Sequence, residues 1–170
     1  MPRITSCLAG LLLLGVASET AVASAREVVV SGTPHTKRKV VPVAEGRVLL
    51  FGPVKLTAEL KETSAPVVVK LEGVTFDPKV GTSSEIFLVD AAGKAKLKID
   101  PTNLIGSIGS MVGSPSEPID SIQEINDFAV EGQQFTPRTR LKKMDEVFIA
   151  IVVRTGKLQL RRAVISTASP

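Results

Sequence analysis

The sequence predicts an all-β protein, folded as a single antiparallel β-sandwich of about seven or eight strands. Three observations support this prediction. Apolar and polar residues alternate with a period of two in several short segments, turn residues recur about every ten residues, and no long amphipathic stretch indicates a helix. A parallel sheet would need amphipathic crossover helices, and none is visible in the sequence.

The first 25 residues have the features of an export signal. Arg3 supplies a short positive region, residues 8–16 (LAGLLLLGV) form an apolar run, and Ala23-Ser24-Ala25 matches a cleavage site. A membrane anchor is the alternative, but the run is shorter than the roughly 20 residues that cross a bilayer. We therefore expect residues 1–25 to be a signal peptide, without stable membrane insertion of the protein. The destination would be the periplasm, the cell surface or the medium.

Removal of this signal leaves few residues that could carry out chemistry. The single cysteine, Cys7, lies in the signal, and His35 is the only histidine. A thiol nucleophile, a zinc or copper site with several His or Cys ligands, and a His-assisted serine triad all need residues that are missing. We expect a protein without disulfides, with no metal and no cofactor, whose stability comes from packing.

Residues 26–47 precede the predicted sandwich domain, which spans residues 48–170. They combine β-branched residues with Gly32, Pro34 and the basic triplet 37–39, which indicates an extended arm or an edge strand. The triplet either contacts an acidic partner or is simply solvated, and solvation is the more common case.

The strands of the domain follow from local patterns. Segments 54–60 and 95–99 alternate between apolar and polar residues, as half-buried strands do, and segment 67–71 places Val67, Val69 and Leu71 on one face. Segment 147–153 (VFIAIVV) is apolar on both faces and rich in β-branched residues, which predicts a central strand covered on both sides.

Turn residues predict two hairpins. Thr155-Gly156 separates segment 147–153 from segment 157–166, and residues 90–93 (DAAG) separate strand 86–89 from strand 95–99.

Two further stretches are less regular. Residues 103–113 contain three glycines, which indicates a strand with a bulge or a close backbone approach, and residues 136–144 form either a short basic helix or a loop.

Two classes of ligand are disfavoured. The glycines of residues 103–113 match neither a dinucleotide fingerprint nor a phosphate loop with its lysine. The net charge is +4, but acidic residues are interleaved with the basic ones and six phenylalanines are the only aromatic residues. Nucleic-acid binders add stacking platforms or a basic helix, so we expect no nucleic-acid partner.

Residues 48–90 contain a phrase that resembles a known family. This segment (VLLFGPVKLTAELKETSAPVVVKLEGVTFDPKVGTSSEIFLVD) is similar to the β-sandwich domain that follows the dicopper domain in polyphenol oxidases and tyrosinases. The family-like positions are Glu72, Gly73, Val74, Phe76 and Asp77. Downstream, Gly106 and Ser107 lie in a phrase similar to the family's Ala-Gly-Ser-Phe/Ile strand, and residues 145–157 resemble its penultimate strand and final turn. The resemblance covers roughly residues 48–166.

The resemblance implies a companion domain without the enzyme. The family's catalytic domain binds two coppers through histidines, and one histidine cannot hold them. In the family the sandwich packs over the mouth of the copper site and shields it, often with a bulky plug side chain. No residue of this chain is identified as a plug.

Three hypotheses for function follow. The first is a non-catalytic exported module that associates with a separately encoded tyrosinase-like oxidase. The second is a stand-alone structural or adhesive sandwich that binds a protein, a glycan or another envelope component. The third is a hydrolase-type enzyme that uses carboxylates such as Asp77, Glu85, Asp90 and Asp100, although acidic residues at strand ends and turns are usually just solvated.

Overall fold

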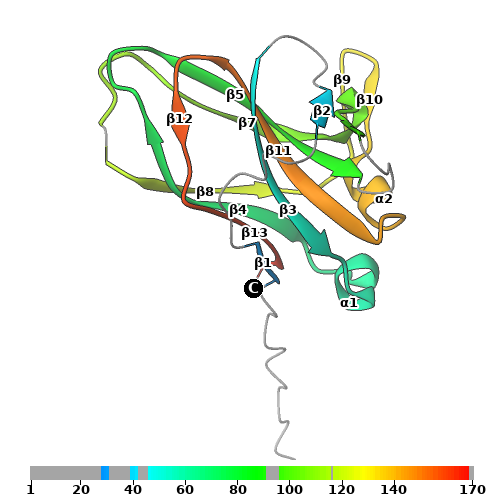
Figure 1. Cartoon of the computed structure of the whole chain (residues 1–170). Coiled ribbons are helices and arrows are strands. Elements are labelled where there is room, and N and C mark those ends of the chain that lie inside the picture. The colour runs from blue at the N-terminus through cyan, green and yellow to red at the C-terminus, as the bar shows by residue number, and fades with distance from the viewer. Residues whose placement is uncertain (1–27, 31–38, 42–45, 91–95, 116, 169–170) are drawn as a thin grey trace, which may run out of the picture.

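Two antiparallel sheets form the body of the protein in a computed structural model that describes residues 28–30, 39–41, 46–90, 96–115 and 117–168 (Figure 1). One sheet contains β1 (Val28–Val30), β13 (Arg162–Thr167), β4 (Val67–Phe76), β12 (Leu158–Gln159) and β8 (Ile119–Glu124). The other has the order β3 (Arg47–Lys55), β11 (Glu146–Thr155), β5 (Thr82–Asp90) and β7 (Leu104–Ser110). The predicted all-β, antiparallel class is confirmed, with nine described strands in the two sheets where seven or eight were expected.

Smaller elements lie outside the two sheets of the sandwich. A hairpin consists of β9 (Phe128–Val130) and β10 (Gln133–Phe135), and a parallel pair consists of β2 (Lys39–Val41) and β6 (Lys96–Lys98). The described helices are α1 (Ala58–Glu62), α2 (Pro137–Leu141) and the 3-10 turn η1 (Pro101–Asn103). None of the helices in these ranges has the length and apolar character of a membrane span.

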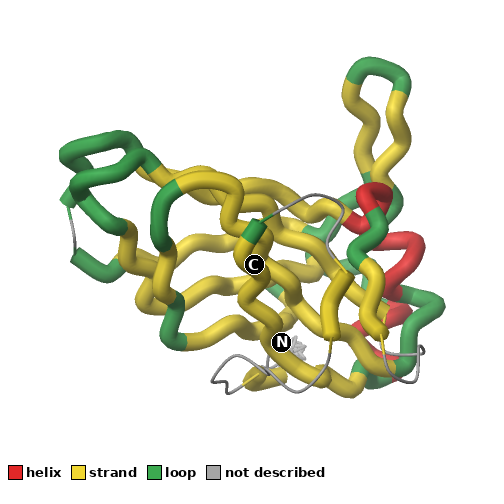
Figure 2. The backbone as a smooth tube through the Cα atoms, turned by 45° about the horizontal axis from the view of Figure 1, so that its top comes forward, coloured by secondary structure: helices red, strands yellow, loops and turns green. Residues whose placement is uncertain are grey.

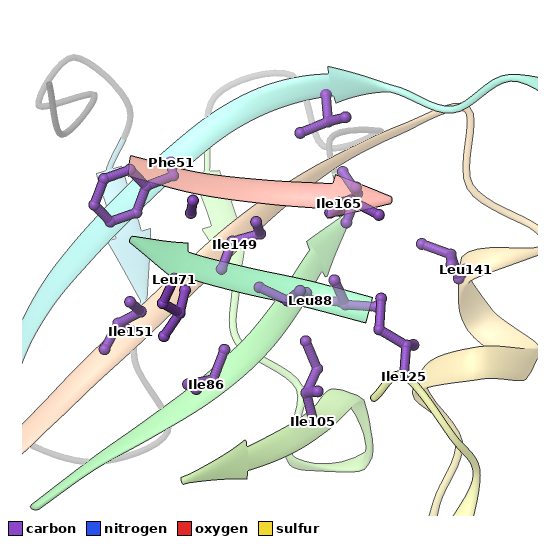
Figure 3. Close-up of a cluster of buried hydrophobic side chains, with 14 of the residues drawn as sticks. Phe51, Leu71, Ile86, Leu88, Ile105, Ile125, Leu141, Ile149, Ile151 and Ile165 are labelled. Atoms are coloured by element: carbon purple, nitrogen blue, oxygen red, sulfur yellow. The ribbon is translucent and has the colours of Figure 1, made fainter. Parts of the chain in front are cut away.

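The core between the sheets is almost entirely aliphatic. Leu71 and Ile165 from one sheet face Ile86, Leu88 and Ile149 from the other, and all five side chains are fully buried (Figure 3). Phe51 is a fully buried aromatic side chain in this cluster. Burial of each such side chain contributes about 1.5–3 kcal/mol of hydrophobic free energy, so packing alone can hold the sandwich together.

Strand β11 is covered on both faces, as its sequence predicts. Ile149 and Ile151 point into the core, whereas Phe148, Ala150 and Val152 belong to a second buried cluster on the opposite face of the sheet. That outer cluster is completed by residues of β3, β5 and the β6 region, listed here: Leu50, Phe87, Val89, Leu97 and Ile99. With β3 on one side and β5 on the other, β11 is the central strand of its sheet.

The prediction of a strand over residues 54–60 is wrong beyond Lys55. Strand β3 ends at Lys55, and Thr57 caps helix α1 by accepting a hydrogen bond from the backbone N–H of Leu60 (3.3 Å). Leu56 and Leu60 are both buried. Their spacing of four residues fits one face of a helical turn as well as it fits a strand, and the threonine cap decides in favour of the helix.

Both predicted hairpins are also wrong, although Gly156 does lie in a bend as expected. Gly156 has φ +73, but the chain then crosses to the other sheet, where β12 and β13 pair with β4 and not with β11. Strand β5 pairs with β11 and β7, while β6 pairs with β2 in parallel. Turn residues mark where a chain reverses, and in a sandwich the next strand can join either sheet.

The two irregular segments are resolved by the structure. Residues 104–110 form β7, whose register against β5 shifts between Gly106 and Leu104, which confirms a bulged strand. Residues 137–141 form the short helix α2. The predicted signal peptide, Cys7 and His35 lie outside the described residues.

Candidate functional site

The family-like phrase from Glu72 to Asp77 forms a bulge and a turn. At Gly73 the backbone of β4 adopts φ +65, and the register of β4 against β8 shifts between Leu71 and Val74. The backbone N–H of Gly73 donates to Oδ1 of Asp120 (3.0 Å). The bulge divides β4 into a part that pairs with β13 and a part that pairs with β12. Glycine is needed here because L-residues rarely adopt this φ.

Glu72 is a buried carboxylate surrounded by cations. Its oxygens lie 3.1 Å from Nζ of Lys70, 3.4 Å from Nη1 of Arg162 and 4.0 Å from Nη2 of Arg161. The hydrogen bond and the negative charge of Glu72 raise the pKa of Lys70. Similarly, the Gly73 N–H lowers the pKa of Asp120. Each carboxylate in this cluster lies within 4.0 Å of at least one cation, so the bulge is surrounded by a network of ion pairs.

Asp77 closes the turn that follows β4. Its Oδ1 accepts from the backbone N–H of Lys79 (3.0 Å), its carbonyl accepts from Val80, and its Oδ2 lies 3.8 Å from Nζ of Lys157. Phe76 packs into the core, and Val74 is fully buried beside it. The phrase is therefore explained by the fold: its apolar members fill the core and its polar members hold the backbone.

Shallow grooves flank strand β12. One has a volume of about 450 Å³ and is lined by Thr75, Phe76, Asp77, Lys157 and Gln159. A smaller one of about 150 Å³ lies between β12 and the start of β3, and Arg47, Leu49 and Val153 contribute to its walls. Asp77 is the one carboxylate among the residues that line these two grooves, and it also closes the turn after β4.

The other family-like positions lie on β7, away from this bulge. Gly106 faces β8, where a Cβ atom would lie 2.5 Å from Oε1 of Gln123. The next residue, Ser107, is exposed to solvent. The structure thus brings Glu72, Gly73 and Asp77 into one region and places Gly106 and Ser107 in another.

The four carboxylates considered for catalysis each have a place in the fold. Glu85 accepts hydrogen bonds from Arg154 (Nε to Oε2, 3.0 Å), Asp77 closes its turn, and Asp90 ends β5 opposite Val147. Asp100 caps η1 by accepting from the N–H and the hydroxyl of Thr102. Burial opposes ionisation of Asp100, but these hydrogen bonds and Arg140 lower its pKa. Within the described ranges, no three His, Cys, Asp or Glu side chains gather as a metal site would require.

Sequence reasoning missed the most prominent surface feature, a hairpin of β9 and β10 that projects from the body (Figure 2). Glu131 (φ +50) and Gly132 (φ +81) form its two-residue turn, and the side chains of residues 129–134 are exposed. At the base, Phe128 stacks on Phe135 with ring centroids 4.7 Å apart. The available signal was the pair Glu131-Gly132 between two short apolar-polar runs.

Asp127 anchors this hairpin to helix α2. Its Oδ1 accepts from the backbone N–H groups of Arg138 (2.9 Å) and Thr139 (3.0 Å), and Oδ2 accepts from the Thr139 hydroxyl. Burial would raise the pKa of Asp127, but these hydrogen bonds outweigh burial and lower it. The Arg138 guanidinium in turn donates to the carbonyls of Leu60 and Thr63 near the end of α1. The hairpin therefore projects from a fixed base.

Comparison with known proteins gives matches among solved structures only. No protein-family model matches the chain, and no curated protein matches it. A latent aurone synthase (polyphenol oxidase) is 15% identical with a TM-score of 0.49, and 83% of this chain covers 29% of that protein. Latent apple tyrosinase is 17% identical with a TM-score of 0.47, and 82% of this chain covers 31% of it. The chain spans less than a third of these proteins, which are of the family that the sequence resembles.

Proposed function

We propose that this chain is a non-catalytic, exported binding module that associates with a separately encoded tyrosinase-like copper oxidase. The observation that carries this proposal is the projecting hairpin β9–β10. A convex ribbon with exposed Ala129, Val130, Gln133 and Gln134 fits a concave surface on another protein, and its anchor on Asp127 keeps its shape before binding. A preorganised element loses little conformational freedom on association.

The class of partner is inferred from the sequence. The resemblance of residues 48–166 to the sandwich domain of polyphenol oxidases implies that the surface it would meet is that of a dicopper oxidase. Association with such an enzyme would shield its active site or stabilise its fold. The chain would then act as a separate shielding domain, whereas in the family this domain is part of the same polypeptide as the catalytic domain.

A mixing experiment tests this proposal. The purified chain is combined with a dicopper oxidase encoded in the same genome, and complex formation and diphenol oxidation are measured together. We expect a complex and a change in oxidase activity or lifetime. Val130→Asp should weaken the complex, whereas Ile122→Asp, on a strand away from the hairpin, should not. A mixture that forms no complex contradicts the proposal.

A second candidate function is stand-alone binding to an envelope component. It is favoured by an apolar tip formed by Val80, Met111 and Val112, whose exposed fractions are 46%, 83% and 70%. The two loops of this tip are joined by a hydrogen bond from the N–H of Gly113 to the carbonyl of Pro78 (2.9 Å). Retention in an envelope fraction that is lost in Met111→Ser with Val112→Ser, and that needs no oxidase, would support this candidate over the first.

A further inference from the structure

Among the described strands, β7 is an edge of its sheet. It pairs with β5 along one side, and no described strand pairs with its other side, so backbone N–H and C=O groups along that side have no strand partner. Its sequence, LIGSIGS, has no proline and no charged residue. The uncharged stretch extends from residue 101 to residue 116.

The opposite edge of the same sheet is protected. Strand β3 carries Arg47 and Lys55 at its ends and, close to Lys55, Pro53, which has no N–H to donate. Charges and proline are the usual means by which proteins prevent edge-to-edge pairing. The contrast within one sheet identifies β7 as an edge that remains available for pairing.

An edge strand of the other sheet lies close to β7. Strand β8, an edge of the other sheet, approaches β7 where Gln123 meets Gly106. It carries Ile119 and Ile122 with exposed fractions of 48% and 61%. Gln123 pairs with the buried Val69 and Ile122 with Lys70, so Ile122 lies on the outer face of its sheet, and strand addition at β7 would rest on its backbone groups.

We propose that β7 pairs with β7 of a second copy of this chain in an antiparallel, two-fold symmetric dimer. An uncharged strand is not repelled by its own copy, and a two-fold axis at Ser107, the central residue of β7, pairs the whole strand with itself. This register sets Gly106 opposite Ile108 of the partner copy, small against large, on both sides of the axis. The two four-stranded sheets would join into one continuous sheet.

Introducing a charge at the two-fold axis tests this dimer and its register. In Ser107→Lys, two like charges would lie directly opposite each other, and the same holds for Ser107→Asp. Sedimentation velocity should show a concentration-dependent dimer for the unaltered full chain, and in each variant the Kd of the dimer should rise by up to about fivefold. An equimolar mixture of the two variants should recover the dimer as a mixed pair.

Val130→Lys, on the projecting hairpin, is the matched control and should dimerise like the unaltered chain. Recovery in the mixture would also show that both Ser107 variants are folded. A monomeric unaltered chain at about 100 µM, well above the Kd of a specific dimer, overturns the proposal. So does a dimer that persists in both single variants, or a mixture that stays monomeric. This outcome is independent of whether the chain binds an oxidase.

Discussion

The backbone N–H of Gly73 donates to the carboxylate of Asp120 at 3.0 Å, which joins the bulge of β4 to the edge strand β8. Gly73 therefore has a structural role, because the bulge lies where β4 passes from pairing with β13 to pairing with β12. The conformation of Gly73 and the space around it also determine what a substitution should cost.

Gly73→Ala should destabilise the protein by about 1–3 kcal/mol, because φ +65 is strained for alanine and the new Cβ would lie 3.0 Å from Cβ of Arg161. Gly113→Ala is the matched control. Its φ is +83, but no atom lies within 4 Å of the new Cβ, so only the backbone cost applies. Urea unfolding measures both. An equal loss in the two variants would show that the contact with Arg161 contributes nothing.

Removal of the buried carboxylate of Glu72 should also lower the free energy of unfolding. Glu72→Ala leaves Lys70 and Arg162 without their shared partner, and we expect a loss of roughly 1–2 kcal/mol after allowance for the solvent exposure of these cations. Glu59→Ala, at an exposed position of α1, should change the free energy of unfolding by about 0.5 kcal/mol or less. Thermal or urea unfolding distinguishes the two. Similar small effects would contradict a structural role for Glu72.

Asp127 should make the hairpin anchor sensitive to acid. Its pKa is lower in the folded protein than in the unfolded chain, so its contribution is present above the unfolded value, about pH 3.9, and is lost as pH falls through the folded value. The free energy of unfolding should therefore fall below about pH 4, and Asp127→Asn should flatten that part of the curve. Thr139→Val, which removes one donor, should have an intermediate effect. If the free energy of unfolding of Asp127→Asn fell below about pH 4 as steeply as that of the unaltered chain, this role of Asp127 would be contradicted.

Substitutions of buried side chains on the outer face of the β3–β11–β5–β7 sheet should destabilise the protein as much as substitutions in the core between the sheets. Phe148→Ala on that face should cost about 3–5 kcal/mol, comparable to Ile149→Ala on the inner face at about 2–5 kcal/mol. Ile122→Ala, at an exposed position, should cost much less. Equilibrium unfolding tests this comparison. A small effect for Phe148→Ala would mean that the outer face is not well covered.

Structure was predicted correctly where a sequence pattern is compatible with only one kind of element. Seven consecutive apolar residues at 147–153 leave little choice but a strand buried on both faces. The alternation at residues 67–71 likewise predicted a strand, and Val67, Val69 and Leu71 are buried in β4. In both cases the residues that carry the signal are the residues that pack.

Prediction failed where local signals admit two outcomes. Leu56 and Leu60 fit a strand or a helical turn, and the Thr57 cap decided between them. Gly156 marked a reversal, but the sheet that accepts the next strand depends on the packing of distant residues such as Leu71 and Ile165. The hairpin anchor was not predictable, because the Asp127–Arg138 contact joins elements whose proximity only the fold creates.

The most direct test of the proposed function is hydrogen exchange of the chain with and without its oxidase. Binding through the hairpin predicts slower exchange of the backbone amides of residues 129–134 in the complex, with β3 unaffected. The same protection should be reduced in Val130→Asp. Exchange at residues 129–134 that stays unchanged when the oxidase is saturating would contradict the account.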